Sequence, residues 1–155
     1  MMTWSPDSST TGGTITGFTT PTFTNVDSKP LVINAVKKVV SAISTMGSAV
    51  ANSATLPFFA EFTIPAQLKA LPPANPLSGL RSTPPTNQYK LVVVKGGYAA
   101  AGVPVKAIAR LTIDVPAGMD TYGADDVKAL ISYLVGLLNE ESNDLAETCC
   151  SGVMA

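Results

Sequence analysis

The sequence predicts an α+β fold in which an antiparallel β-sheet comes first and helices follow, packed on one face of the sheet. Three observations support this. Segments of alternating or β-branched apolar residues fill the chain up to Pro116, an amphipathic helical pattern begins only after Gly123, and 155 residues suffice for one ordinary domain. The apolar share of 46% also suits a core that a partner completes. We therefore expect residues 1–155 to form a single domain.

The first third of the chain combines a polar start with two apolar segments. Residues 1–12 are expected to be mobile, and the Thr-rich alternation at 14–18 and 22–24 predicts a hairpin of short strands. Residues 31–51 are ambiguous, because β-branched content suits strands whereas the period favours a helix. The residues on that helical stripe are Val32, Val36, Val39, Val40, Ile43, Met46 and Val50. We predict mainly sheet over 13–115, with a helix at 31–51 as the favoured alternative to a strand.

The middle of the chain predicts three strands and a loop. Residues 58–64 alternate and stop at a proline, and residues 71–85 contain five prolines, which excludes both a ladder and a helix. Residues 89–95 give the clearest strand, and residues 105–115 give a second strong one. The connection at 96–104, which includes Gly96, Gly97 and Gly102, is expected to be a flexible tip. The pair predicts an antiparallel hairpin with a long tip.

The C-terminal part predicts two helices. Asp125 and Asp126 occupy the first turn of the first helix, where backbone amides favour negative charge. Its apolar residues repeat at helical spacing: Val127, Leu130, Ile131, Leu134, Leu137 and Leu138. Residues 144–154 can form a second, short helix with Asp144 as its cap.

Charge is strongly segregated along a chain whose net charge is only -1. Residues 1–28 carry -2, residues 29–110 carry +8 and residues 111–155 carry -7. A sheet from the middle segment and helices from the last one would give the molecule a positive and a negative side, and the positive side would attract phosphate.

Composition excludes several classes of function. The chain has no histidine, which rules out imidazole bases, Ser-His-Asp and Cys-His arrangements and histidine metal sites. No secretory signal and no apolar run of roughly 18 residues is present, so we expect no membrane partner. Cys149 and Cys150 are adjacent, unlike metal or redox motifs, and are either passive thiols or the source of a disulfide between chains. We expect no enzyme activity, no cofactor, no metal and no small-molecule substrate.

Three segments stand out together: the strand from Asn87 to Lys95, the segment from Ala109 to Pro116, and the following helix with its Leu137-Leu138 pair. In this order they resemble the coat protein of the single-stranded RNA bacteriophages, whose "N-x-Y-K-V-x-V" strand looks like the segment from Asn87 to Lys95. They cover roughly residues 58–155 in order and spacing, at low residue identity.

The resemblance implies a sheet of about six strands and a homodimer. In that dimer two sheets join edge to edge and each C-terminal helix crosses onto the partner's sheet, so its apolar stripe forms the dimer interface. Many dimers would then build an icosahedral shell around the RNA genome, in a virion made in the bacterial cytoplasm, with the glycine tip at contacts between subunits. The leucine-rich stripe of the C-terminal helix has little of its own chain to cover it, and burial against a partner subunit would cover it.

The candidate RNA site lies on the two strongest strands. Lys90 on one strand and Lys106 and Arg110 on the other would form a basic strip suited to backbone phosphates if they share a face. The family has polar side chains where this chain has Val92 and Ile108, which argues against recognition of a specific hairpin. At most one of Lys37 and Lys38 can join the strip. The alternatives are a non-viral dimeric α+β nucleic-acid-binding protein and an enzyme of unknown class.

Overall fold

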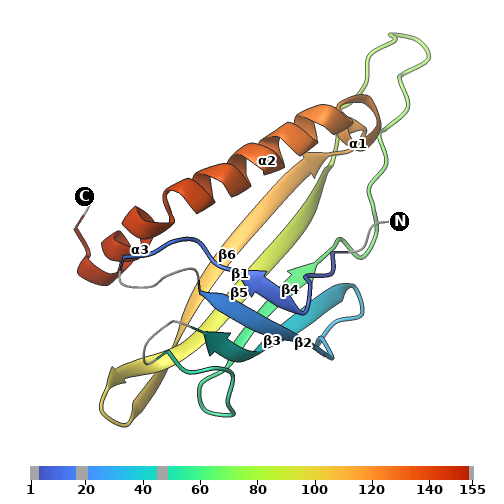
Figure 1. The fold of residues 1–155 in the computed structure, drawn as a ribbon. Coiled ribbons are helices and arrows are strands. Elements are labelled where there is room, and N and C mark those ends of the chain that lie inside the picture. Colours follow the sequence, from blue (N-terminus) through green and yellow to red (C-terminus); the bar gives the residue numbers. More distant parts are fainter. Residues whose placement is uncertain (1–3, 17–20, 45–48, 154–155) are drawn as a thin grey trace.

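The computed structural model describes residues 4–16, 21–44 and 49–153, and its sheet is a six-stranded antiparallel meander in the order β1-β2-β3-β4-β5-β6 (Figure 1). The strands are β1 (Ser9–Thr11), β2 (Thr22–Ser28), β3 (Ala35–Ser44), β4 (Phe58–Thr63), β5 (Thr86–Ala100) and β6 (Val103–Pro116). The helices are α1 (Met119–Tyr122), α2 (Ala124–Glu140) and α3 (Ser142–Ser151). The predicted order of strands first and helices last is confirmed.

The register of the strands divides the sheet into two faces. Side chains alternate along each strand, and directly paired residues point to the same side. Tyr89 pairs with Ile113, and both line an apolar cavity of about 230 Å³ together with Val127 and Ile131 of α2. We call this side the helix face and the opposite side the open face. Figure 1 shows α2 running back along β6 on one side of the sheet.

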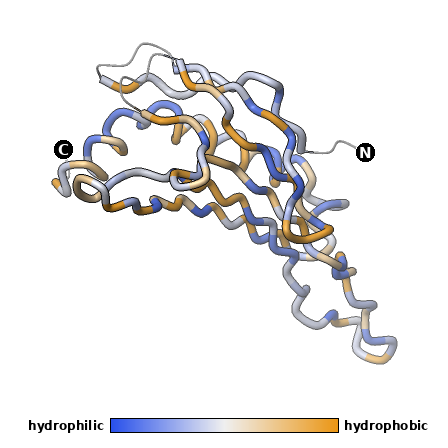
Figure 2. Tube along the Cα trace, turned by 90° about the horizontal axis from the view of Figure 1, so that it is seen from below, coloured by the Kyte–Doolittle hydropathy of each residue, from blue (hydrophilic) through white to orange (hydrophobic). Residues whose placement is uncertain are grey.

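The core between sheet and helices is thin. Among the described residues, Val40 is a buried apolar side chain of the sheet on the helix face, whereas α2 has no buried residue. Three aromatic pairs add contacts: Trp4 with Phe62, Phe62 with Tyr89, and Phe23 with Phe58. Apolar residues recur along the helices as well as the strands in Figure 2. The single chain thus leaves apolar surface that its own fold does not cover.

The helix favoured at 31–51 is wrong, because residues 35–44 form β3. This strand lies between β2 and β4, and its adjacent pairs Lys37-Lys38 and Val39-Val40 put a lysine and a valine on each face. Val36 and Val40 point to the helix face, and Val39 points to the open face. An interior strand of this kind lacks clean alternation, and its apolar residues can fall on a helical stripe by chance. Residues 45–48, including Met46 of the stripe, lie outside the described residues.

The hairpin of β5 and β6 is confirmed, but its long flexible tip is wrong. β5 continues through Ala100 and β6 begins at Val103, so Gly96 and Gly97 lie within a strand and only Gly102, with φ +77°, lies in the turn. Gly96 has a different role. A Cβ there would lie 2.5 Å from the Cα of Leu56, so glycine lets the backbone of Leu56 cross the sheet at this position.

The N-terminal hairpin exists with other bounds than expected. Its first strand is β1 at 9–11, inside the segment expected to be mobile, and its second strand is β2. Residues 1–3 and 17–20, which include the Gly17-Phe18 part of the predicted first strand, lie outside the described residues.

The C-terminal helices follow the prediction closely. The first one, α2, begins at Ala124, directly after Gly123, and carries both expected aspartates in its first turn. The second, α3, begins at Ser142 with Glu141 rather than Asp144 at its cap position. The short helix α1 was not predicted.

Candidate nucleic-acid interface

The open face brings the three predicted basic residues together. Lys90 pairs with Thr112, Val92 with Arg110, and Gly96 with Lys106, so Lys90, Arg110 and Lys106 all point to this face. All three are exposed. Lys90 and Arg110 are diagonal neighbours, with Cα atoms roughly 7–8 Å apart. Lys106 lies four residues along β6 from Arg110, about 13 Å away. The strip therefore spans a length over which several backbone phosphates could bind.

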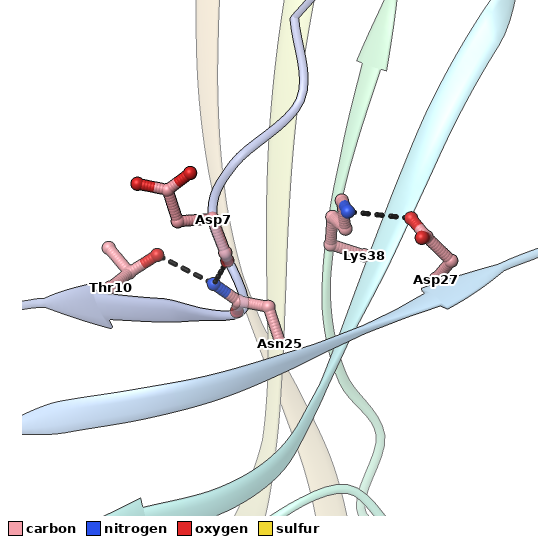
Figure 3. A network of polar contacts seen from close by, with 5 residues as sticks. All are labelled: Asp7, Thr10, Asn25, Asp27 and Lys38. Carbon is pink, nitrogen blue, oxygen red and sulfur yellow. Dashed lines mark hydrogen bonds and ion pairs between the residues drawn. The ribbon is translucent and has the colours of Figure 1, made fainter.

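The structure also separates the two adjacent lysines of β3. Lys37 pairs with Glu61 and points to the open face, where its Nζ lies 4.0 Å from the centre of the Phe59 ring. Lys38 points to the helix face, is 8% exposed and forms a 2.6 Å ion pair with Asp27 (Figure 3). Lys37 is thus the one that joins the basic strip, and the strand assignment of this segment is what decides it.

Two acidic side chains share the open face with the bases. Glu61 lies on β4 beside Lys37, and Asp114 lies on β6, where its Oδ1 accepts a 3.0 Å hydrogen bond from Nε2 of Gln88. Asp114 was missed in the sequence, although it is an even number of residues from Arg110 and alternation could have placed it. Among the described strand residues, the four bases Lys37, Lys90, Lys106 and Arg110 outnumber these two acids, so this face is positive.

A transverse apolar row crosses the open face between the basic residues. It runs from strand to strand through paired positions: Val26, Val39, Phe59, Val94 and Ile108. This row leaves few polar groups for reading base edges in the middle of the face. Polar groups converge at one end, in a depression of about 340 Å³ whose lining includes Asn34, Thr63, Lys69, Gln88 and Lys90.

One basic residue of β5 is turned away from the strip. Lys95 points to the helix face, where its Nζ donates hydrogen bonds to the carbonyl oxygens of Val50 (2.7 Å) and Gly96 (2.8 Å). Desolvation by the surrounding protein lowers the pKa of Lys95 below its ordinary value. Its ammonium group therefore serves the fold rather than a ligand.

The strip lies beside a free edge of the sheet. The outer side of β6 pairs with no other strand among the described residues, and its residues from Val103 to Arg110 are exposed. A strand edge of this length offers a row of backbone donors and acceptors for pairing with another chain.

The apolar stripe of α2 is divided between covered and uncovered side chains. Val127 and Ile131 line the cavity against the sheet, but Ile131 is still 39% exposed, and Leu130 and Leu137 are 55% and 42% exposed. Leu138 is 45% exposed and Leu134 is partly covered. The helix therefore contacts its own sheet with one side of the stripe and leaves the other side open.

Cys149 and Cys150 are both exposed on α3 and form no disulfide in the chain. A bond between chains stays a prediction. Among the described residues no three His, Cys, Asp or Glu side chains gather as a metal site, and no helix is both long and apolar enough to cross a membrane.

Comparison with known proteins decides the family. No family model and no curated protein matches the chain. A solved structure described as the virus-like particle of bacteriophage ESE020 matches with a TM-score of 0.92 and 32% identity, covering 97% of this chain and 99% of that one. The chain belongs to the coat proteins of the single-stranded RNA bacteriophages.

Two further solved structures share the fold of this coat protein. The virus-like particle of Beihai levi-like virus 32 has a TM-score of 0.54 at 16% identity and covers 86% of this chain and 88% of that one. The virus-like particle of bacteriophage GQ-907 has a TM-score of 0.53 at 17% identity, with 93% and 91% covered. The coat protein is accordingly a structural capsid protein of a virion. The alternative of a non-viral nucleic-acid-binding protein is set aside by the family match.

Proposed function

We propose that this coat protein forms homodimers in the cytoplasm of its bacterial host, that the dimers assemble into an icosahedral shell, and that the open face holds single-stranded genomic RNA inside it. The observation that carries the proposal is the register of β5 and β6. It gathers Lys90, Lys106 and Arg110 on the face opposite the helices, next to the outer edge of β6, which pairs with no strand in the described part of the chain.

The dimer follows from two surfaces that meet at this edge. Pairing of β6 with β6 of a second copy would satisfy the exposed backbone groups and join two sheets into one. The same contact would bring the second sheet next to α2, where Leu130 and Leu137 remain exposed. Burying the open side of the stripe on the partner's sheet supplies the apolar area that a permanent interface needs.

The dimer would also enlarge the RNA site. Lys106 and Arg110 lie on the edge strand, so a two-fold axis beside β6 would join the basic strips of the two copies into one larger surface. Phosphate contacts from such a strip bind RNA independently of sequence and weaken with salt. The apolar row supports this mode of binding over recognition of one particular hairpin.

The test is charge reversal of the strip. Lys90→Glu, Lys106→Glu and Arg110→Glu together should reduce the RNA packaged per particle severalfold and leave dimers intact, because each loses a phosphate contact and adds repulsion. RNA content is measured from the absorbance ratio of purified, nuclease-treated particles, and dimers by light scattering.

Two double variants with the same change in net charge test whether RNA content depends on where the charges lie or only on the net charge of the protein. Lys90→Glu with Arg110→Glu changes the net charge by the same amount as Lys29→Glu, in the connection after β2, with Lys128→Glu, on α2. Only the first pair should lower RNA content. Equal losses in both pairs would remove the open face from the RNA site.

A further inference from the structure

The connection between β4 and β5 contains a stiff projection that the dimer and the RNA site do not use. Residues 71–85, which we call the proline arm, extend away from the sheet and helices (Figure 1, light green). Its five prolines fix φ at five positions and limit the conformations of the residues before them. A projection of this length with so many prolines is unusual for a connection that only joins two neighbouring strands.

The base of the arm is anchored to the fold. The side chain of Asn87, which is 8% exposed, forms two hydrogen bonds with the backbone of Lys69, at 2.8 and 3.1 Å. The backbone amide of Ala117 donates to the carbonyl of Pro85 at 2.8 Å. Leu71 packs against Gly118, where a Cβ would lie 3.2 Å from its side chain. These contacts fix the direction in which the arm leaves the sheet.

The tip of the arm is folded on itself. The backbone amide of Asn75 donates to the carbonyl of Leu80, and the amide of Gly79 donates to the carbonyl of Asn75, both at 2.8 Å. The side chain of Asn75 accepts a 2.9 Å hydrogen bond from the amide of Leu77, and Gly79 supplies the positive φ of +68° that closes the turn. The tip therefore has a defined shape before it meets any partner.

This shaped tip displays apolar side chains to solvent. Leu77 is 97% exposed and Leu80 is 73% exposed, although a turn of the same shape could be built from polar residues. The arm carries one charge, from Arg81. Two exposed leucines with one cation on a preorganised loop make a small docking element, since little conformational entropy is lost when it binds.

We propose that the tip of the proline arm docks on the helical layer of a neighbouring copy in the shell, with its leucines against α3 and Arg81 against the acidic residues at the junction of α2 and α3. This inference rests on the proposed shell. The partner is a second copy because the residues from 111 to 155 carry -7 and offer an exposed apolar side chain, Leu145, beside an exposed acidic cluster. That cluster consists of Glu140, Glu141 and Asp144.

The geometry makes this a contact between two chains. The arm emerges beside α1 at the start of α2, whereas the acidic junction is at the opposite end of that helix (Figure 1). A helix of 17 residues is about 25 Å long. The anchored arm points away from this junction in its own chain, so the site that it fits belongs to another copy.

The first test removes the docking groups. Leu77→Ser with Leu80→Ser should leave dimers unchanged and lower the yield of particles at least tenfold at equal dimer concentration. The control is Leu68→Ser, which changes an exposed leucine outside the arm and should assemble as the unmodified chain does. Arg81→Glu should also reduce assembly, and Glu140→Lys with Glu141→Lys in the same chain should restore it.

The second test locates the contact. Leu77→Cys in purified particles, treated with a short bis-maleimide, should crosslink to Cys149 or Cys150 of another chain, whereas isolated dimers should not. Leu68→Cys is the control and should give no such product. Peptide mass spectrometry identifies the joined residues.

The outcomes distinguish the inference from the proposed function. If the unmodified chain forms no particles, the shell itself is wrong and the inference falls with it. If the unmodified chain forms particles and the double serine variant assembles equally well, only the docking is wrong. The proposed docking would also be overturned if position 77 crosslinks to position 77 of another copy, or if it gives no crosslink. Either result means that the tip of the arm does not contact a helical layer.

Discussion

The two edges of the sheet differ in length and in how their backbone groups are used. β1 has three residues. The side chain of Asn25 on β2 holds it in place, because its Nδ2 donates to the carbonyl of Asp7 (2.9 Å) and to Oγ1 of Thr10 (2.6 Å; Figure 3). β6 has fourteen residues, and its outer side has no strand partner within the described residues. Folded proteins keep edge strands short or covered unless the edge serves pairing.

This contrast assigns different roles to the two ends of the chain. The β1 edge completes the fold of one subunit, and the β6 edge is the surface that our proposed dimer uses. Changes at β6 should therefore affect association with little effect on the fold, and changes around β1 and β2 should do the reverse.

Proline substitution on β6 should have the largest effect. Successive residues of a strand direct their backbone groups to opposite sides, so of Ile108 and Ala109 one donates to β5 and the other points to the outer edge. Proline at the outward position removes a backbone donor and adds a clash, and the dimer axis applies the change twice. We expect one of Ile108→Pro and Ala109→Pro to give a folded monomer whose dimer Kd rises at least ~100-fold.

The check is sedimentation or light scattering together with circular dichroism. Thr10→Pro on β1 is the control and should leave the dimer Kd unchanged. A full dimer from both β6 variants would show that this edge is not the interface.

Truncating the open side of the α2 stripe should have a smaller effect. Leu130→Ala and Leu137→Ala remove side chains that are about half exposed in one chain but buried in the proposed dimer. Burial of such a side chain is worth about 1–2 kcal/mol, so each should raise the dimer Kd by about tenfold or more and leave the stability of the monomer nearly unchanged. Dilution isotherms measure this, and Tyr122→Ala, on α1 and 84% exposed, is the control. An equal shift from the control would mean that the stripe is not part of the interface.

The sequence predicted the secondary-structure elements correctly where the local pattern and the tertiary environment favour the same structure. β4 and β6 alternate or stop at prolines, and α2 repeats at helical spacing, so all three were placed nearly correctly. β3 was not recognised as a strand because it carries a lysine and a valine on each face, so its sequence lacks clean alternation. The role of Gly96 could not be predicted either, since the crossing backbone of Leu56 is forty residues away in sequence.

The residues of the candidate site also divide into those that local pattern could place and those that needed the strand register. Lys106 and Arg110 are an even number of residues apart on one strand, so alternation alone puts them on one face, and Asp114 could have been added by the same rule. Lys90 joins them only through the register of β5 and β6, which depends on the two-residue turn after Ala100. The choice of Lys37 over Lys38 needed the strand assignment of β3, which local pattern did not supply.

The smallest predicted effect concerns the ion pair on the β1 side of the sheet. Asp27→Asn removes the carboxylate that pairs with Lys38, whose side chain is 10% exposed, and leaves a poorly solvated ammonium group. Asp27 itself is 83% exposed, so solvent weakens the pair and the expected loss of unfolding free energy is about 1–2 kcal/mol. Asp125→Asn, which breaks a pair with both partners exposed, should leave stability within experimental error in urea unfolding. Because Lys38 lies far from β6 in the strand order, the dimer Kd should not change; a weaker dimer in Asp27→Asn would mean that the two edges are coupled and that their roles are not separate.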